Sequence, residues 1–223
     1  MNTRLLSRLL GLSLAAVPAM ADVVTEPART WSVGYVLDDL QDPPASFVLT
    51  VSDSAIRSLT QVEVGLRLVG VAPGCGCAGE MFVSLTRDLG RTSILLNGVG
   101  IDSGNSVGFG YDGWDVGFRD EAANGDVHGA SLFDGVMRGE WQPDGRIHAG
   151  DTGRPLSLGV FNGQAGNGEW RLNVADLELG GQMRLEAWSL TLTGVTEVPE
   201  ASTWAANAAL VGLVAAGWWR RRR

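Results

Sequence analysis

Residues Phe161–Leu192 read FNGQAGNGEWRLNVADLELGGQMRLEAWSLTL and contain two runs in which apolar and polar residues alternate. The apolar positions of the two runs are Trp170, Leu172, Val174, Met183, Leu185 and Ala187. A period of two is typical of strands that bury one face. Gly180 and Gly181 separate the runs and tolerate the backbone of a tight turn. The stretch therefore predicts two strands of a β-rich core.

The second run changes phase within itself. After Ala187 the apolar positions become Trp188, Leu190 and Leu192. A slip of one residue would turn a strand inside out, so we expect a β-bulge near Ala187–Trp188.

Other short alternating segments fill the rest of the body. We expect strands in residues 31–40, 47–51, 61–68, 81–85, 92–96 and 156–160. No segment of the body has a helical period, and Gly- and Asp-rich turns separate the runs. The pattern predicts an all-β fold, an antiparallel β-sandwich or jelly roll.

The stretch that opens this section also resembles a known family. Its pattern F-x-G, G-x-W-x-L-x-V-x-D and L-x-x-W-x-L resembles the closing half of the P domain of kexin- and furin-like subtilases. The matching positions are Phe161, Gly163, Gly168, Trp170, Leu172, Val174, Asp176, Leu185, Trp188 and Leu190. The likeness extends over residues 31–195, through VGFRDEA at Val116–Ala122 and GEWQPDG at Gly139–Gly145, but departs from the family at Val69–Gly79. It implies a galactose-binding-like β-sandwich without catalytic residues of its own.

The N-terminus is typical of a secretory signal peptide. Residues 1–21 carry two arginines, a short apolar run and the small-x-small site Ala19-Met20-Ala21. The alternative is an N-terminal core helix. Residues 22–30 lack periodicity, and we interpret them as a linker.

The C-terminal segment, residues 196–223, resembles the PEP-CTERM sorting signal. The motif Val198-Pro199-Glu200 precedes an apolar stretch of 16 residues, Trp204–Trp219. The chain then ends in four arginines, Arg220, Arg221, Arg222 and Arg223, which favour a cytoplasmic end. Ala201 replaces a second proline of the family.

The resemblance implies export by way of a signal peptidase and a transient inner-membrane anchor through a hydrophobic helix at 204–219. An exosortase would then release the protein to the cell surface or the extracellular space. The alternative is a permanent membrane anchor.

The charge of the body argues against nucleic acid as a partner. The chain contains no lysine, and six of its 17 arginines lie in the two end segments. The remaining 11 arginines face 25 acidic residues, which gives the body a net charge of about −14. Such a surface repels phosphate backbones, and it suits cations or simple solubility.

The sequence offers little for hydrolytic catalysis. A Ser-His-Asp site needs a histidine base, and His128 and His148 are the only histidines, both in Gly- and Asp-rich segments. The chain has no G-x-S-x-G elbow and no Gly-rich phosphate loop between a strand and a helix. We therefore expect a protein that is not an enzyme.

Cys75 and Cys77 are the only cysteines, and three interpretations remain open for them. They could form a local disulfide, which would close a small ring. They could form links to other chains or remain a free dithiol, or they could bind a metal. Neither histidine is near them in the sequence, which weakens the metal interpretation.

Acidic loops are the remaining candidates for a metal site. Asp112, Asp115, Asp120 and Asp126 place hard oxygen ligands close together in the sequence, as calcium prefers. Some P domains bind calcium, and the resemblance supports this hypothesis. Asp-rich turns also form without any metal.

Two functional hypotheses follow. The first is an exported, non-catalytic surface or exopolysaccharide-matrix protein whose P-domain-like module has a binding or structural role. The second is an accessory domain that acts in trans with a separate secreted subtilisin-like protease. P domains pack beside the catalytic domain in such proteases, but this chain contains no catalytic domain.

Overall fold

The structure is a computed structural model, which describes residues 21–72, 78–88, 90–106, 108–130 and 135–196. Val23–Glu197 form one compact unit. Within the described residues the regular structure consists of ten strands and three 3₁₀ helices. The 3₁₀ helices are η1 (Ala78–Glu80), η2 (Val127–Gly129) and η3 (Leu158–Phe161). The predicted all-β sandwich is thus confirmed.

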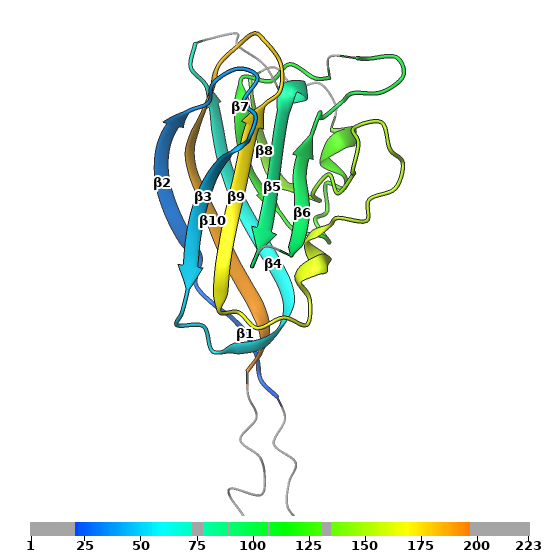
Figure 1. Cartoon of the computed structure of the whole chain (residues 1–223). Helices are drawn as coiled ribbons and strands as arrows, with labels where there is room; N and C mark the ends of the chain where they lie inside the picture. The colour runs from blue at the N-terminus through cyan, green and yellow to red at the C-terminus, as the bar shows by residue number, and fades with distance from the viewer. Residues whose placement is uncertain (1–20, 73–77, 89, 107, 131–134, 197–223) are drawn as a thin grey trace, which may run out of the picture. The chain divides into compact units, whose positions relative to one another are not determined.

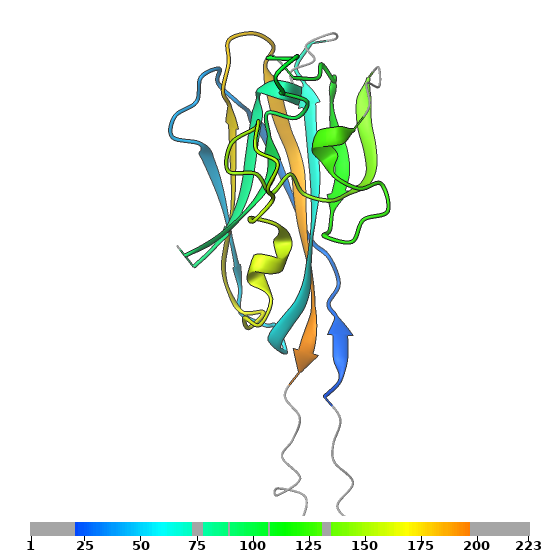
Figure 2. The ribbon, with the colours of Figure 1, turned by 90° about the vertical axis from the view of Figure 1, so that its right-hand side faces the viewer.

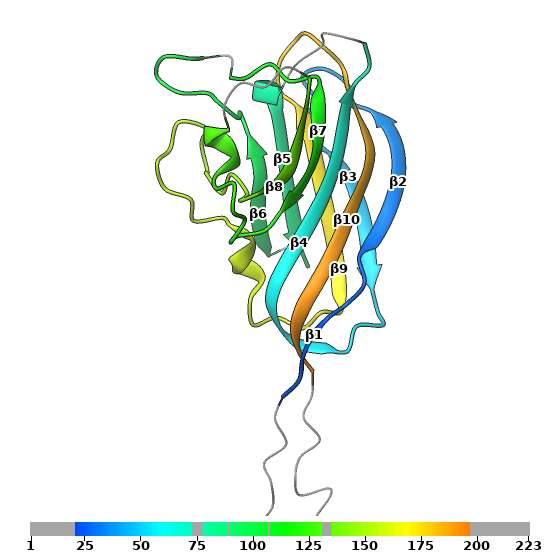
Figure 3. The same cartoon turned by 180° about the vertical axis from the view of Figure 1, so that it is seen from behind.

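The larger sheet has six strands and is seen in Figure 3. Its order is β1 (Val23–Thr25), β10 (Met183–Thr196), β4 (Ile56–Gly70), β7 (Gly113–Phe118) and β8 (Val136–Trp141), with β2 (Arg29–Val36) also paired to β10. The β7–β8 pair is parallel, whereas an antiparallel sandwich was expected. The reason is the long connection 119–135, which returns the chain to the end where β7 began.

The smaller sheet has four strands and faces the viewer in Figure 1. Its order is β3 (Ala45–Val51), β9 (Gly168–Asp176), β5 (Met81–Arg87) and β6 (Arg91–Asn97). Figure 2 shows the two sheets as separate layers. The core lies between them, and its largest fully buried side chains include Trp114, Trp170, Tyr111, Phe118 and Phe161.

The expected bulge is present in β10. Leu185 pairs with Leu68 and Ala187 pairs with Arg67, so Glu186 is the extra residue. At this bulge the residues of β10 that face the core change from odd-numbered to even-numbered positions, so both Leu185 and Trp188 are buried.

Two predictions about local structure were wrong. Residues 156–160 were expected to form a strand, but Leu158–Phe161 form η3, whose first backbone N–H groups bind the carboxylate of Asp120. Residues 22–30 were interpreted as a linker, but Val23–Thr25 form β1 and Arg29 begins β2. An edge strand is held by its backbone ladder, which needs no apolar period.

The ladders define two ends of the sandwich. Val23 pairs with Val195, so the chain enters and leaves at one end. Met183 pairs with Gly70 at the opposite end, where β2, β4, β6 and β9 finish. We call the connections 37–44, 71–80 and 177–182 at that end, as far as they are described, the loop end (Figure 1).

Candidate functional site at the loop end

Backbone hydrogen bonds join the loop-end connections to one another. The N–H of Gln41 donates to the carbonyl of Asp176 at 3.0 Å, and the N–H of Leu177 donates to the carbonyl of Glu80 at 3.0 Å. Asp176, the last residue of β9, is also the ladder partner of Met81. Three segments that are distant in the sequence are therefore fixed side by side.

These contacts bring together three carboxylates. The N–H of Gly180 donates to Asp39 Oδ2 at 3.3 Å, and a Cβ on Gly180 would lie 3.6 Å from Glu80 Oε1. The carboxylates of Asp39 and Glu80 thus border the same glycine. Asp176 is fully buried beside them, and its Oδ1 accepts a long hydrogen bond of 3.4 Å from the N–H of Glu178.

The environment of Asp176 disfavours its charged form. Burial raises the pKa of Asp176 to about 6, and the negative charges of Glu80, Asp39 and Glu178 act in the same direction. The hydrogen bond from the N–H of Glu178 opposes this shift only in part. Asp176 is therefore a carboxylate held among like charges.

The loop end also exposes apolar side chains. Six of the nine large hydrophobic side chains that are exposed in the described residues belong to it or directly adjoin it. They are Tyr35, Val36, Leu40, Val71, Leu177 and Leu179. Leu179 is 73% exposed, so nothing within the described chain covers it. Gathered apolar exposure of this kind is typical of an interaction surface.

A surface cavity of about 350 Å³ adjoins the acidic residues. Glu80, Leu177, Glu178 and Leu179 contribute one side of it, and Asn97 and Gly98 at the end of β6 contribute another. The cavity therefore lies beside the acidic residues Glu80 and Glu178.

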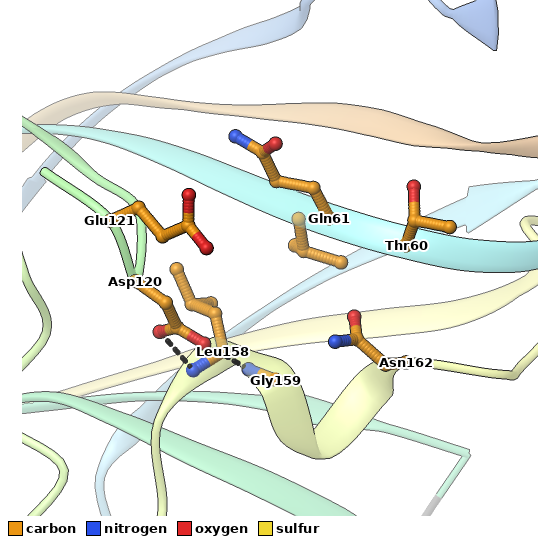
Figure 4. A pocket seen from close by; sticks show the side chains of 8 residues that line it. Thr60, Gln61, Asp120, Glu121, Leu158, Gly159 and Asn162 are labelled. Atoms are coloured by element: carbon orange, nitrogen blue, oxygen red, sulfur yellow. Dashed lines mark hydrogen bonds between the residues drawn. The ribbon is translucent and has the colours of Figure 1, made fainter. Parts of the chain in front are cut away.

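A second cavity, of about 140 Å³, lies near the other end of the sandwich and is shown in Figure 4. Asp120 lines it, but its carboxylate accepts hydrogen bonds from the N–H groups of Leu158 and Gly159 and from the hydroxyl of Ser157. Asp120 therefore acts as a cap for η3, with few lone pairs left for a ligand.

Two of the other residues predicted to bind calcium are paired with arginines. Asp115 forms an ion pair with Arg138 at 2.7 Å, and Asp126 forms one with Arg146 at 2.6 Å. Asp112 lies in the turn before β7, where its carbonyl accepts from the N–H of Gly70. Within the described residues, no three acidic, His or Cys side chains lie close enough together to hold a metal ion.

The histidines are engaged in structural contacts. His128 Nδ1 lies 2.7 Å from Asp144 Oδ2, and its Nε2 lies 3.0 Å from the carbonyl of Ile101. The hydrogen bond with the buried Asp144 raises the pKa of His128, against the effect of burial. His148 is largely exposed, beside Asp151. Neither ring is hydrogen-bonded to a hydroxyl or thiol in the described part of the chain, so the arrangement lacks the nucleophile–base pair of a hydrolase.

Several predicted residues lie outside the described residues. These are Cys75 and Cys77, the motif Val198-Pro199-Glu200, the apolar stretch 204–219, the tail Arg220–Arg223 and the signal peptide apart from Ala21. Among the residues that are described, no helix is long and apolar enough to cross a membrane.

Sequence reasoning missed that Asp39, Glu80 and Asp176 lie on connections that backbone hydrogen bonds join. One signal was available, because Asp176 continues the inward phase of Trp170, Leu172 and Val174. An acidic residue at an inward position of a strand is unusual and indicates a special environment. Glu80 carried no such signal, since it precedes its strand.

Comparisons with known proteins give limited similarity. No protein-family model matches the chain, and no curated protein matches it. Among solved structures, it is similar to the complex of the Aeromonas sobria serine protease with its chaperone ORF2, at 15% identity and a TM-score of 0.48. The Aeromonas sobria serine protease alone matches at 16% identity and a TM-score of 0.46.

These matches cover 79% and 78% of this chain. In each case the chain spans 28% of the length of the protein it matches. The resemblance to the P domain and to the PEP-CTERM signal stays a prediction from the sequence.

Proposed function

We propose that the chain is an exported, non-catalytic binding module of the cell surface or the exopolysaccharide matrix. In this proposal an exosortase processes the C-terminal segment, and the loop end binds the partner. The observation that supports it is the gathering of exposed apolar side chains at the loop end.

The test compares the location of variants in the producing bacterium. Leu177→Ser combined with Leu179→Ser removes two exposed leucines from one connection of the loop end. Val48→Ser, an exposed position in the middle of β3, is the matched control. We expect the double variant to move several-fold from the matrix fraction to the medium, and the control to stay in the matrix. Unchanged retention of the double variant would contradict binding through the loop end.

The aliphatic composition of the exposed loop-end residues favours another protein as a second candidate partner. Its exposed residues are mainly aliphatic, and Tyr35 is the one aromatic side chain among them in the described chain. Exposed apolar patches are typical of protein–protein interaction sites. The second proposal is therefore an accessory role in trans with a separate secreted subtilisin-like protease. Deletion of the gene would then lower secreted protease activity, and the chain carrying both serine substitutions would fail to restore it.

A further inference from the structure

β3 is an edge strand of the smaller sheet, as Figure 1 shows. Its residues Ala45–Val51 pair with β9 on one side only. Within the described residues, no other backbone hydrogen bond reaches Ala45–Val51. The strand therefore presents unpaired N–H and C=O groups along its outer edge. Such groups can pair with a strand of another chain.

The other edge strands of the described chain carry features that hinder this kind of pairing. β1 has only three residues. In β2, a register shift and the positive φ of Gly34, +68°, mark a bulge that interrupts the edge. β8 bears the charges of Arg138 and Glu140. The outer edge of β6 is covered, because the backbone of Ile94 is hydrogen-bonded to the segment 144–156.

β3 has none of these protective features. It is seven residues long, its register with β9 is unbroken, and it contains neither a charged residue nor a proline. Its sequence, ASFVLTV, is rich in residues that favour strands. A long, regular and uncharged edge is the type that pairs with another strand. The unprotected edge of β3 therefore points to a partner strand.

The sequence of β3 is nearly symmetric in chemical class about Val48. Ser46 and Thr50 carry hydroxyls at equal distances from Val48, and Phe47 and Leu49 are both large and apolar. Antiparallel pairing of two copies about a two-fold axis at Val48 would place Ser46 opposite Thr50 of the second copy. It would also place the two Val48 side chains opposite each other. Both kinds of cross-strand pair are favourable, so the strand is complementary to itself.

The surroundings of β3 suit a second copy as well. The body carries a net charge of about −14, so two copies associate best through surfaces without unpaired acidic groups. Next to β3, Arg171 of β9 forms an ion pair with Glu169. Tyr35 of β2 contacts Phe47 edge to face, with 5.5 Å between the ring centroids, and is still 38% exposed. An added strand has an apolar surface to cover there.

We propose that β3 pairs antiparallel with β3 of a second copy, about a two-fold axis at Val48, and that the chain forms a dimer. An axis perpendicular to the sheet keeps the buried faces of both copies on the same side, so the two smaller sheets become one continuous sheet. The pairing uses both free edges, and the assembly closes at two chains. The interface is small, so we expect a dissociation constant in the micromolar range. This inference goes beyond the proposed function and does not depend on it.

Sedimentation velocity of the purified full-length protein, over concentrations that span the micromolar range, tests the proposal. We expect a reversible equilibrium between monomer and dimer. Val48→Asp places like charges opposite each other at the axis and should raise the dissociation constant by roughly tenfold or more. Ser32→Asp, at an exposed position of β2, adds the same charge away from this edge and is the matched control. Val48→Ser leaves the edge uncharged and should change the dissociation constant only a few-fold.

Two double variants test the register. Ser46→Glu with Thr50→Arg sets opposite charges across the axis and should keep the dimer, whereas Ser46→Glu with Thr50→Glu sets like charges there and should abolish it. A wild type that stays monomeric throughout the micromolar range would overturn the proposal. A dimer that Val48→Asp leaves unchanged, equal effects of the two double variants, or growth beyond two chains would each overturn it as well.

Discussion

The contact between Asp120 and η3 offers a quantitative test of the fold. One carboxylate accepts two backbone N–H groups, those of Leu158 and Gly159 (Figure 4). It also accepts the hydroxyl of Ser157. These bonds tie the segment after β7 to the 3₁₀ helix that precedes β9. Asp120→Ala removes every acceptor at once and leaves the backbone donors of η3 without a protein partner.

The size of the effect follows from the number of bonds. Hydrogen bonds to a charged group contribute roughly 1.5–3 kcal/mol each, and water partly replaces them where the site is half-exposed. We take about 1–1.5 kcal/mol for each backbone bond and little for the hydroxyl, which can turn to water. The expected loss in the free energy of unfolding is about 2–3 kcal/mol, or about 5–10 °C in melting temperature for a domain of this size.

Chemical denaturation with urea measures this loss, and the neighbouring carboxylate provides the control. Glu121 is exposed and makes no hydrogen bond among the described residues, so Glu121→Ala should change the stability by less than about 0.5 kcal/mol. If Asp120→Ala stays within about 1 kcal/mol of the wild type, the carboxylate is not the main support of η3. The apolar packing of Leu158 and Phe161 would then be the main support.

Two further predictions concern the His128 contact and the β10 bulge. Asp144 raises the pKa of His128, so the contact stabilises the fold fully below about pH 6.5 and is lost as pH rises through the folded pKa. Urea titrations from about pH 5.5 to 8.5 should therefore show that the difference in unfolding free energy between wild type and His128→Gln shrinks as the pH rises. For the exposed His148→Gln, the difference from wild type should not change with pH. A pH-independent difference for His128→Gln would contradict a charged contact with Asp144. Deletion of Glu186 removes the extra residue and keeps Leu185 and Trp188 on the core side, so the protein should still give soluble folded material by circular dichroism. Deletion of Ser189 would instead turn either the preceding or the following part of β10 outward and should abolish folding. If the two deletions gave the same outcome, the placement of the bulge at Glu186 would be wrong.

The strands that could be predicted from the sequence are those in which apolar and polar side chains alternate, because that alternation shows which face is buried. In β9 and in most of β4 every second residue is apolar, and one buried face explains that period. The bulge was predictable for the same reason, because the phase slip in β10 has no other regular explanation. The sandwich follows from many such strands without a helical segment.

Other elements could not be predicted from the sequence, because contacts between segments that are distant in the sequence determine them. β1 is held by pairing with β10, and η3 is held by a carboxylate from a loop 38 residues earlier. The parallel pairing of β8 depends on the path of a long connection, which leaves no period in the sequence. The acidic loops suggested calcium at Asp112, Asp115, Asp120 and Asp126, but spacing along the chain does not show that arginines or backbone N–H groups neutralise most of them.

The loop-end carboxylates differ from those acidic loops in what surrounds them. Asp115, Asp120 and Asp126 each have a donor or cation within hydrogen-bond reach. Asp176 has one long backbone bond, an unpartnered oxygen and like charges around it, although it is fully buried. A strand end that served packing alone would be more stable with an apolar or amide side chain there. A buried carboxylate whose pKa is raised among like charges lowers the stability of the fold at neutral pH, so packing alone does not explain Asp176.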